Sequence, residues 1–187
     1  MMKKSLEALS RFVDTISKYG LAVALSLAFL ATVYQVFSRY VLLSPFMTKF
    51  VSQSILSIFN FPWMEELVRY LFIWTVFLGI TVVYKMKGHA QVEIVTNFLP
   101  LKWKRVSGIA VELFNSLFFL ILMIKGIEMI NITNGQLSPS LQINMAWVYI
   151  SMICCAFFSL IHSILFLAEE LTGGQTEKKD IFHASMP

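Results

Sequence analysis

The chain has 187 residues and a net charge of +4, and 57% of its residues are hydrophobic while only 14% are charged, against about 25% in soluble domains. A folded chain of this length exposes much of its surface, so it cannot hide 17 Phe residues and a mean hydropathy of +0.71 from water. This composition excludes a soluble globular protein and excludes a nucleic-acid partner, because Lys and Arg lie at the ends of apolar runs.

The first segment has a helical amphipathic pattern. Apolar residues recur at helical spacing over residues 3–18, and charged residues occupy the other faces of the wheel. This pattern predicts a helix that lies on the membrane surface. No Asp, Glu, Lys or Arg occurs over 19–38, which is long enough to cross about 30 Å of hydrocarbon. We therefore predict the first transmembrane helix over about 19–43.

The next segment is too short and too polar to cross. Residues 46–60 place polar side chains on one face and apolar side chains on the other, so we expect a helix lying flat at the interface. A second transmembrane helix is predicted over about 63–84. Its first turns carry Glu65, Glu66 and Arg69.

The second half of the chain repeats this alternation of loops and apolar runs. The segment 85–105 holds five Lys or Arg residues around a short amphipathic piece, 90–99, which we expect to be another surface helix. The third transmembrane helix is predicted over about 106–130, and Gly, Ser and Pro residues mark a turn after it. The fourth, over about 146–168, lies in a segment without charged residues.

These elements predict an all-α integral membrane protein with a single four-helix domain over 1–170. The polar segment 171–187 is expected to be a mobile cytoplasmic tail. Lys and Arg number four in the N-terminal segment, five in the 85–105 loop and two in the tail, but only one in the two other loops together. The positive-inside rule therefore predicts that both termini are cytoplasmic. No internal repeat is visible, which argues against an inverted-repeat carrier.

Charged residues cluster where the first two transmembrane helices have their outer ends. Arg39 ends the first helix beside Tyr40, a typical interfacial anchor. Glu65 and Glu66 precede Arg69 by four and three residues, so a local salt bridge is one interpretation. One carboxylate is then left over, and the other interpretation is that it meets Arg39 and ties the two helices together.

Glu112 lies about 9 Å inside the third helix, counted from its predicted start. Gly108 and Asn115 share its face, which favours close packing against another helix, in this chain or in a partner. A proton-relay or substrate-binding carboxylate is the alternative. Lys125 and Glu128 are spaced as a salt bridge near the outer end, where we expect a solvated pair.

The sequence predicts neither an enzyme nor a cofactor or metal site. It holds no Ser-His-Asp set, Gly-rich phosphate loop, zinc-binding helix or Cys/His cluster. Cys154 and Cys155 are adjacent in an apolar run and are expected to be small core residues. His89 and His162 are the only histidines outside the tail, and His89 lies in a polar loop, which does not suit haem ligation between helices.

Several short motifs follow one another along the chain. Their combined order and spacing are more specific than any single motif. They are Arg39-Tyr40, Trp63-x-Glu65-Glu66-Leu67-x-Arg69-Tyr70, Trp74-x-x-Phe77-x-Gly79, His89-x-x-Val92-Glu93 and Leu99-Pro100. In these motifs the chain resembles the small, Q-type membrane subunit of tripartite ATP-independent periplasmic (TRAP) transporters. The resemblance covers about residues 30–105. The outer stretch 42–61 is longer than expected for the family, and Glu93 stands where the family usually has Asp.

The resemblance implies a complex in a bacterial or archaeal inner membrane. A periplasmic substrate-binding protein would capture an organic acid, such as a C4-dicarboxylate or a sialic acid, and a large M-type carrier subunit would import it with sodium. The small subunit would pack beside the large one, in contact with lipid, and enlarge its static scaffold. The candidates for structural or subunit-interface roles are Arg39, Tyr40, Trp63, Glu65, Glu66, Arg69, Trp74, Gly79, His89, Glu112 and Asn115.

Two other functions stay open from the sequence alone. A small proton-coupled exporter needs a membrane carboxylate, and Glu112 is the candidate. A haem or quinone anchor subunit of a redox complex is also a small helical membrane protein. Cation transport by the purified chain that is lost in Glu112→Gln would indicate the exporter. A difference in haem absorption between the reduced and the oxidised protein would indicate the anchor subunit.

Overall fold

The structure is a computed structural model that describes residues 2–42, 44, 49, 61–86 and 101–171. Its four long helices each contain a stretch long and apolar enough to cross a membrane, which confirms the predicted all-α fold with four spans. The helices are α1 (Met2–Phe37), α4 (Trp63–Lys85), α6 (Leu101–Thr133) and α7 (Ala146–Leu171), and the π-helical turn η1 (Ser38–Leu42) follows α1.

Some of the predicted features lie outside the described residues. These are the surface helix over 90–99, His89, the surface helix over 46–60 apart from Lys49, and the tail beyond Leu171. The predicted starts and ends of the second and fourth spans agree closely with the structure. The third span, Val106–Thr133, begins where predicted, and its helix α6 starts five residues earlier, at Leu101, inside the basic segment and directly after a proline in the sequence.

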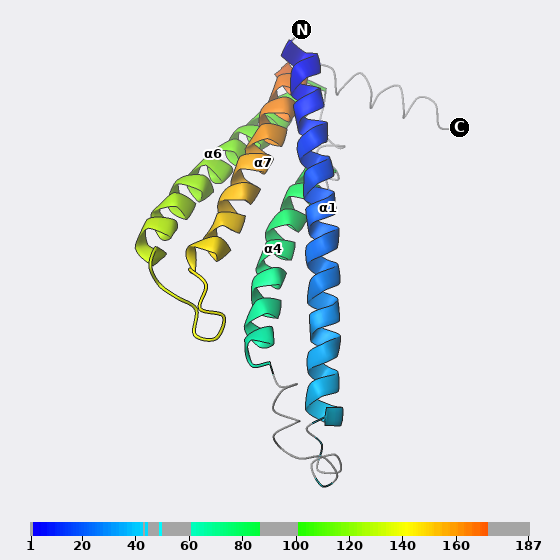
Figure 1. The fold of residues 1–187 in the computed structure, drawn as a ribbon. Coiled ribbons are helices and arrows are strands. Elements are labelled where there is room, and N and C mark those ends of the chain that lie inside the picture. Colours follow the sequence, from blue (N-terminus) through cyan, green and yellow to red (C-terminus); the bar gives the residue numbers. More distant parts are fainter. Residues whose placement is uncertain (1, 43, 45–48, 50–60, 87–100, 172–187) are drawn as a thin grey trace, which may run out of the picture.

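Helix α1 corrects the prediction of a separate surface helix over 3–18. The segment and the first span form one helix of 36 residues, about 54 Å long, which Figure 1 shows as a straight rod along the whole molecule. The buried side of its first part combines Val13 with the small polar residues Ser10 and Ser17, while Leu9 and Ile16 are exposed. The apolar residues that suggested a surface helix are therefore divided between the buried side and the outward side of a packed helix.

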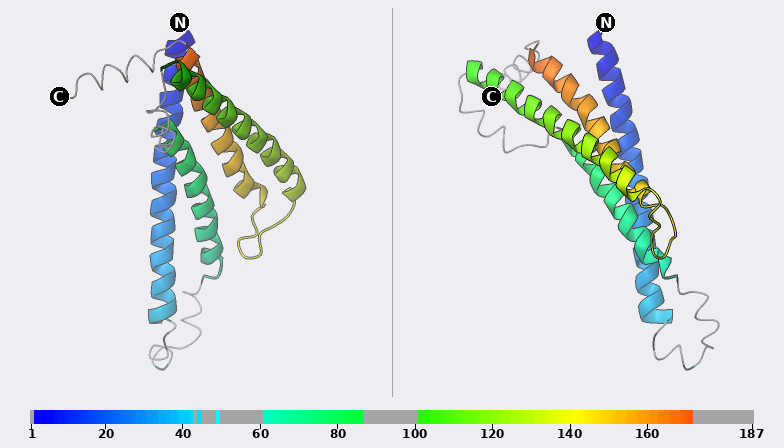
Figure 2. Two further views of the ribbon diagram at one scale, coloured as in Figure 1. Left: turned by 180° about the vertical axis from the view of Figure 1, so that it is seen from behind. Right: turned by 90° about the vertical axis from the view of Figure 1, so that its left-hand side faces the viewer.

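The helices pack as two pairs joined through α7. Helix α1 packs along α4, helix α6 packs on α7, and α7 also contacts α4 and the first part of α1. Figures 1 and 2 show α6 and α7 inclined to α1, with the start of α1, the start of α6 and the end of α7 at one end of the molecule. Helix α7 is the most buried of the four and α6 the least.

Small residues allow the helices to approach closely, as is typical of membrane bundles. A Cβ atom on Gly126 of α6 would lie 2.7 Å from a side-chain carbon of Ile153 in α7. Gly20 of α1 packs in the same way against Leu78 of α4. Free Cys155 is buried in α7, as expected for a small core residue.

The loop between α6 and α7 is an ordered reverse turn, as predicted. Gly135 has a φ of +91°, a value that side chains rarely tolerate. The backbone N–H of Ser138 donates to the carbonyl of Ile143 at 2.8 Å, and the N–H of Met145 donates to the carbonyl of Gln136 at 2.9 Å. These bonds close the loop on itself, and Figure 1 shows it reaching toward the start of α4.

Candidate functional site

Three groups of polar side chains join the helices. The first, the outer cluster, lies where α4 begins. Glu66 is 8% exposed, and its two carboxylate oxygens have separate partners. One accepts from the Tyr70 hydroxyl at 2.5 Å, and the other accepts from the backbone N–H groups of Ser140 and Leu141 at 2.9 and 2.8 Å. The Tyr70 hydroxyl also lies 3.3 Å from the sulfur of Met145. Glu66 thus fastens the α6–α7 loop to α4.

This arrangement corrects both interpretations of the outer charges. Among the described residues, Glu65 and Glu66 form an ion pair with neither Arg69 nor Arg39. The buried carboxylate is instead satisfied by a phenol and two backbone N–H groups, which need no charged partner. Sequence spacing pointed to Arg69, whereas the partners are Tyr70, four residues away, and the backbone N–H groups of Ser140 and Leu141, 74 and 75 residues away.

The exposed charges of this region face two cavities instead. Arg39 and Glu65 line a cavity of about 730 Å³ between the outer ends of α1 and α4. Glu65 and Arg69 line a second cavity, of about 750 Å³, between α4 and α7. Glu65 therefore lines both cavities. Within the described part of the chain it forms an ion pair with neither Arg39 nor Arg69.

The other outer candidates are aromatic. The ring of Phe61 lies 6.0 Å from that of Tyr34 and 5.7 Å from that of Trp63, measured between centroids, which connects α1 to the start of α4. Tyr40 is exposed, as an interfacial anchor would be. Deeper in α4, Trp74 is half-buried.

Gly79, which is half-buried, lies one residue after Leu78 in α4. A Cβ atom on Gly79 would lie 3.9 Å from Leu21 of α1, an ordinary contact distance. It is therefore part of the α1–α4 packing, although less tightly than Gly20.

The second group, the Glu112 cluster, joins three helices near their other end. The Tyr84 hydroxyl of α4 donates to a Glu112 carboxylate oxygen of α6 at 2.6 Å. The Ser163 hydroxyl of α7 lies 3.3 Å from the Glu112 carbonyl oxygen and 2.7 Å from the hydroxyl of Ser116. The helices that pack against Glu112 are thus α4 and α7 of the same chain, which agrees with the close-packing interpretation. Asn115, on the same face of α6, is half-buried.

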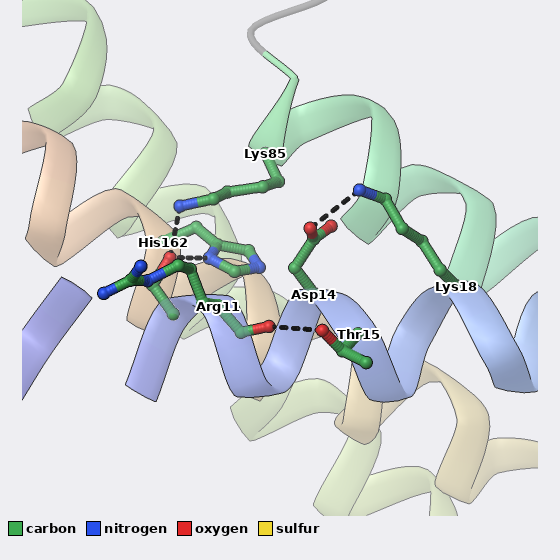
Figure 3. A network of polar contacts seen from close by, with 7 residues as sticks. Arg11, Asp14, Thr15, Lys18, Lys85 and His162 are labelled. Atoms are coloured by element: carbon green, nitrogen blue, oxygen red, sulfur yellow. Dashed lines mark hydrogen bonds and ion pairs between the residues drawn. The ribbon is translucent and has the colours of Figure 1, made fainter. Parts of the chain in front are cut away.

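The third group, the His162 cluster, fastens the first part of α1. Ser10 of α1 and His162 of α7 are both fully buried, and the Ser10 oxygen lies 2.8 Å from His162 Nδ1. The ammonium group of Lys85, at the end of α4, donates to the same Ser10 oxygen. Figure 3 shows Lys85 and His162 reaching toward the turn of α1 that carries Arg11 and Asp14.

The Ser10 hydroxyl of the His162 cluster is shared by two partners. The Lys85 ammonium donates to its oxygen, and the same oxygen forms the hydrogen bond with His162 Nδ1. His162 Nε2 is buried and has no hydrogen-bond partner among the described residues. On the neighbouring turn of α1, Asp14 pairs with Lys18 at 2.8 Å.

Sequence reasoning missed the His162 cluster. It treated the charged residues of 3–18 as a solvated face and His162 only as a haem candidate. The available signal was the series of small residues in α1, which recur at intervals of seven, seven and four positions, on one side of the helix, and which the structure buries. They are Ser10, Ser17, Ala24 and Ala28.

Comparison with known proteins decides the family. The family model described as "Tripartite ATP-independent periplasmic transporters, DctQ component" matches residues 28–173, most of the chain. The chain belongs to this family. As a DctQ component it is part of a transporter and not an enzyme, and its four spans make it a multi-pass protein of the bacterial inner membrane. The match includes the outer and Glu112 clusters, whereas Ser10 precedes it.

A curated relative has a similar description. The chain is 29% identical over 83 residues to the isethionate TRAP transporter permease protein DctMQ of Oleidesulfovibrio alaskensis. The aligned residues are 43% of this chain but only 13% of that protein, so the chain corresponds to a small part of it. No solved structure matches the chain.

Proposed function

We propose that this DctQ component is the small membrane subunit of a sodium-driven TRAP transporter that imports an organic acid. It packs against the large M-type carrier subunit and forms part of the static scaffold. The observation that carries the proposal is the match of the DctQ family to residues 28–173. The DctMQ name of the relative, in a protein much longer than this chain, supports a partnership with the large subunit.

The packing of the four helices supports a static role. The outer cluster, the Glu112 cluster and the His162 cluster join α1, α4, α6 and α7 at several levels, and buried polar contacts of this kind hold helices in one arrangement. Within the described residues the spans are continuous helices, without the broken helices that form substrate sites in carriers. The chain therefore suits a support better than a moving carrier.

The name of the curated relative and the motif resemblance support an organic acid as the substrate class. The curated relative is named for isethionate, an organic acid, and the resemblance of the motifs is to a family that carries C4-dicarboxylates and sialic acids. We infer an organic acid delivered by a periplasmic substrate-binding protein. Both termini are proposed to be cytoplasmic, because the first part of α1 and the start of α6, which Figure 1 places at one end of the bundle, carry seven of the Lys and Arg residues, namely Lys3, Lys4, Arg11, Lys18, Lys102, Lys104 and Arg105.

The proposal is tested by what accompanies the chain from its native membranes. A tagged chain extracted in mild detergent should retain a large multi-span membrane protein that mass spectrometry identifies as a carrier of the same transporter family. The complex in liposomes should then take up the organic acid only with an inward sodium gradient and the binding protein. Recovery of the chain alone, or as a homodimer without a carrier, would contradict the proposal.

A further inference from the structure

Helices α4 and α7 enclose a cavity of about 750 Å³ near their outer ends, and the α6–α7 loop borders it. The residues that line this α4–α7 cavity include Glu65, Arg69, Ile73 and Phe77 of α4 and Val148 and Met152 of α7. Glu66 lines it too, and its bonds to the N–H groups of Ser140 and Leu141 fix the loop beside it. The outer cluster therefore holds the walls of the cavity in place.

The lining of the cavity changes from charged to apolar with depth. Both helices begin at the outer end, so higher residue numbers lie deeper in the membrane. Glu65 and Arg69 lie in the first two turns of α4, whereas Ile73 and Phe77 lie about 6 and 12 Å deeper than Arg69. The deepest lining residue of α7, Met152, is apolar as well. This gradient fits a molecule with a charged end at the headgroup level and an apolar end in the hydrocarbon.

The volume of the cavity favours a lipid over a helix of another protein. A spanning helix about 10 Å across and about 30 Å long fills about 2,400 Å³, three times the volume available. A volume of 750 Å³ lies instead within the range of about 300–1,000 Å³ that is typical of small-molecule sites.

The two charges at the outer end define the headgroup. Glu65 and Arg69 are both exposed, one turn apart on α4, and within the described residues they form no ion pair with each other. A guanidinium group binds a phosphate through two parallel hydrogen bonds, and a carboxylate accepts from an ammonium group. Phosphoethanolamine carries both groups. A phosphoglycerol headgroup lacks the ammonium group, and the quaternary ammonium of phosphocholine has no N–H to donate.

We propose that the α4–α7 cavity is a binding site for phosphatidylethanolamine. The phosphate lies on Arg69, the ammonium group lies on Glu65, and an acyl chain lies along Ile73 and Phe77. Binding uses residues of this chain alone, so its failure would leave the proposed function intact.

Native mass spectrometry tests the headgroup. The complex, washed in detergent to remove bound lipid, is titrated with phosphatidylethanolamine or phosphatidylglycerol and should bind the former at least tenfold more tightly. Arg69→Gln should weaken that binding at least tenfold. Arg39→Gln, at an exposed arginine outside this cavity, is the matched control and should bind as the unsubstituted chain does. Equal binding of the two lipids, or equal binding by the two variants, would mean surface lipid only and would overturn the proposal.

A second pair of variants tests the apolar part of the cavity. Ile73→Trp fills it and should weaken binding of phosphatidylethanolamine at least tenfold, whereas Ile80→Trp, at an exposed position of α4 outside the cavity, should not. A photoreactive phenylalanine analogue at Ile73, irradiated in native membranes, should gain the mass of one phospholipid. An adduct with another polypeptide at this position would overturn the proposal, because the cavity would then be filled by protein.

Discussion

Glu66 connects α4 to the loop between α6 and α7, which also closes on itself through backbone hydrogen bonds. Its carboxylate receives three hydrogen bonds, two of them from backbone N–H groups of the loop. Backbone donors near a membrane need protein partners, because lipid supplies none. The motif Trp-x-Glu-Glu thus contains one carboxylate with a structural task and one, Glu65, that stays exposed.

Replacing Glu66 with Ala should lower the unfolding temperature by several degrees. The change leaves the Tyr70 hydroxyl and two loop N–H groups without their acceptor. The measurement is thermal unfolding in detergent, followed by circular dichroism. Glu65→Ala is the control and should unfold with the unsubstituted chain; a Glu66→Ala chain that does the same would show that the loop is held by other contacts.

Ser10 has a comparable role at the opposite end. Ser10→Ala removes the group that connects Lys85 to His162, and leaving such buried groups without a partner costs about 1–3 kcal/mol. We expect a lower free energy of unfolding and faster proteolysis of the first part of α1. Ser26→Ala, at an exposed position on the same helix, should have neither effect. Equal behaviour of the two variants would mean that Ser10 does not hold α1.

At the scale of the helices, the sequence allowed some features to be predicted and concealed others. Apolar runs predicted all four spans, although the second and third contain charged residues, because the hydropathy of a segment is a local property of the chain. The continuity of α1 was missed because the apolar and charged spacing of 3–18 was interpreted as a separate helix lying on the membrane surface. In a membrane bundle, small residues such as Ser17 and Ala24 face the partner helix.

The partners of buried polar groups were beyond prediction for another reason. Glu66 meets Leu141, and Ser10 meets His162, across separations of 75 and 152 residues. Which turns become neighbours depends on helix inclination and loop path, which no local pattern encodes. Residue types that need partners could be identified, but not the partners themselves.

The small-residue contact between α6 and α7 gives a prediction at this scale. Gly126→Ala should destabilise the chain by about 1–3 kcal/mol, because the new methyl group would lie 2.7 Å from Ile153. Gly79→Ala is the matched control, since its methyl group would have 3.9 Å to Leu21 and Ala favours a helix over Gly. Denaturant unfolding in micelles should therefore separate the two; equal stability would show that α6 and α7 can move apart at no cost.

For the whole molecule, the account requires a fixed orientation in the membrane. Green fluorescent protein fused after the last residue should fluoresce, because it folds in the cytoplasm. Alkaline phosphatase inserted at Gln136, in the α6–α7 loop, should be active, because it folds in the periplasm. The opposite pair of results would reverse the orientation and place the outer cluster on the cytoplasmic side.

The central claim is that the chain is a static support of the carrier. The most direct measurement is sodium-driven uptake of the organic acid by the complex in liposomes, before and after the chain is covalently crosslinked to the scaffold part of the large subunit. A static scaffold predicts that uptake per complex is unchanged at full linkage. Uptake that falls in proportion to the linked fraction would contradict the account, because it would mean that the two surfaces move against each other during transport.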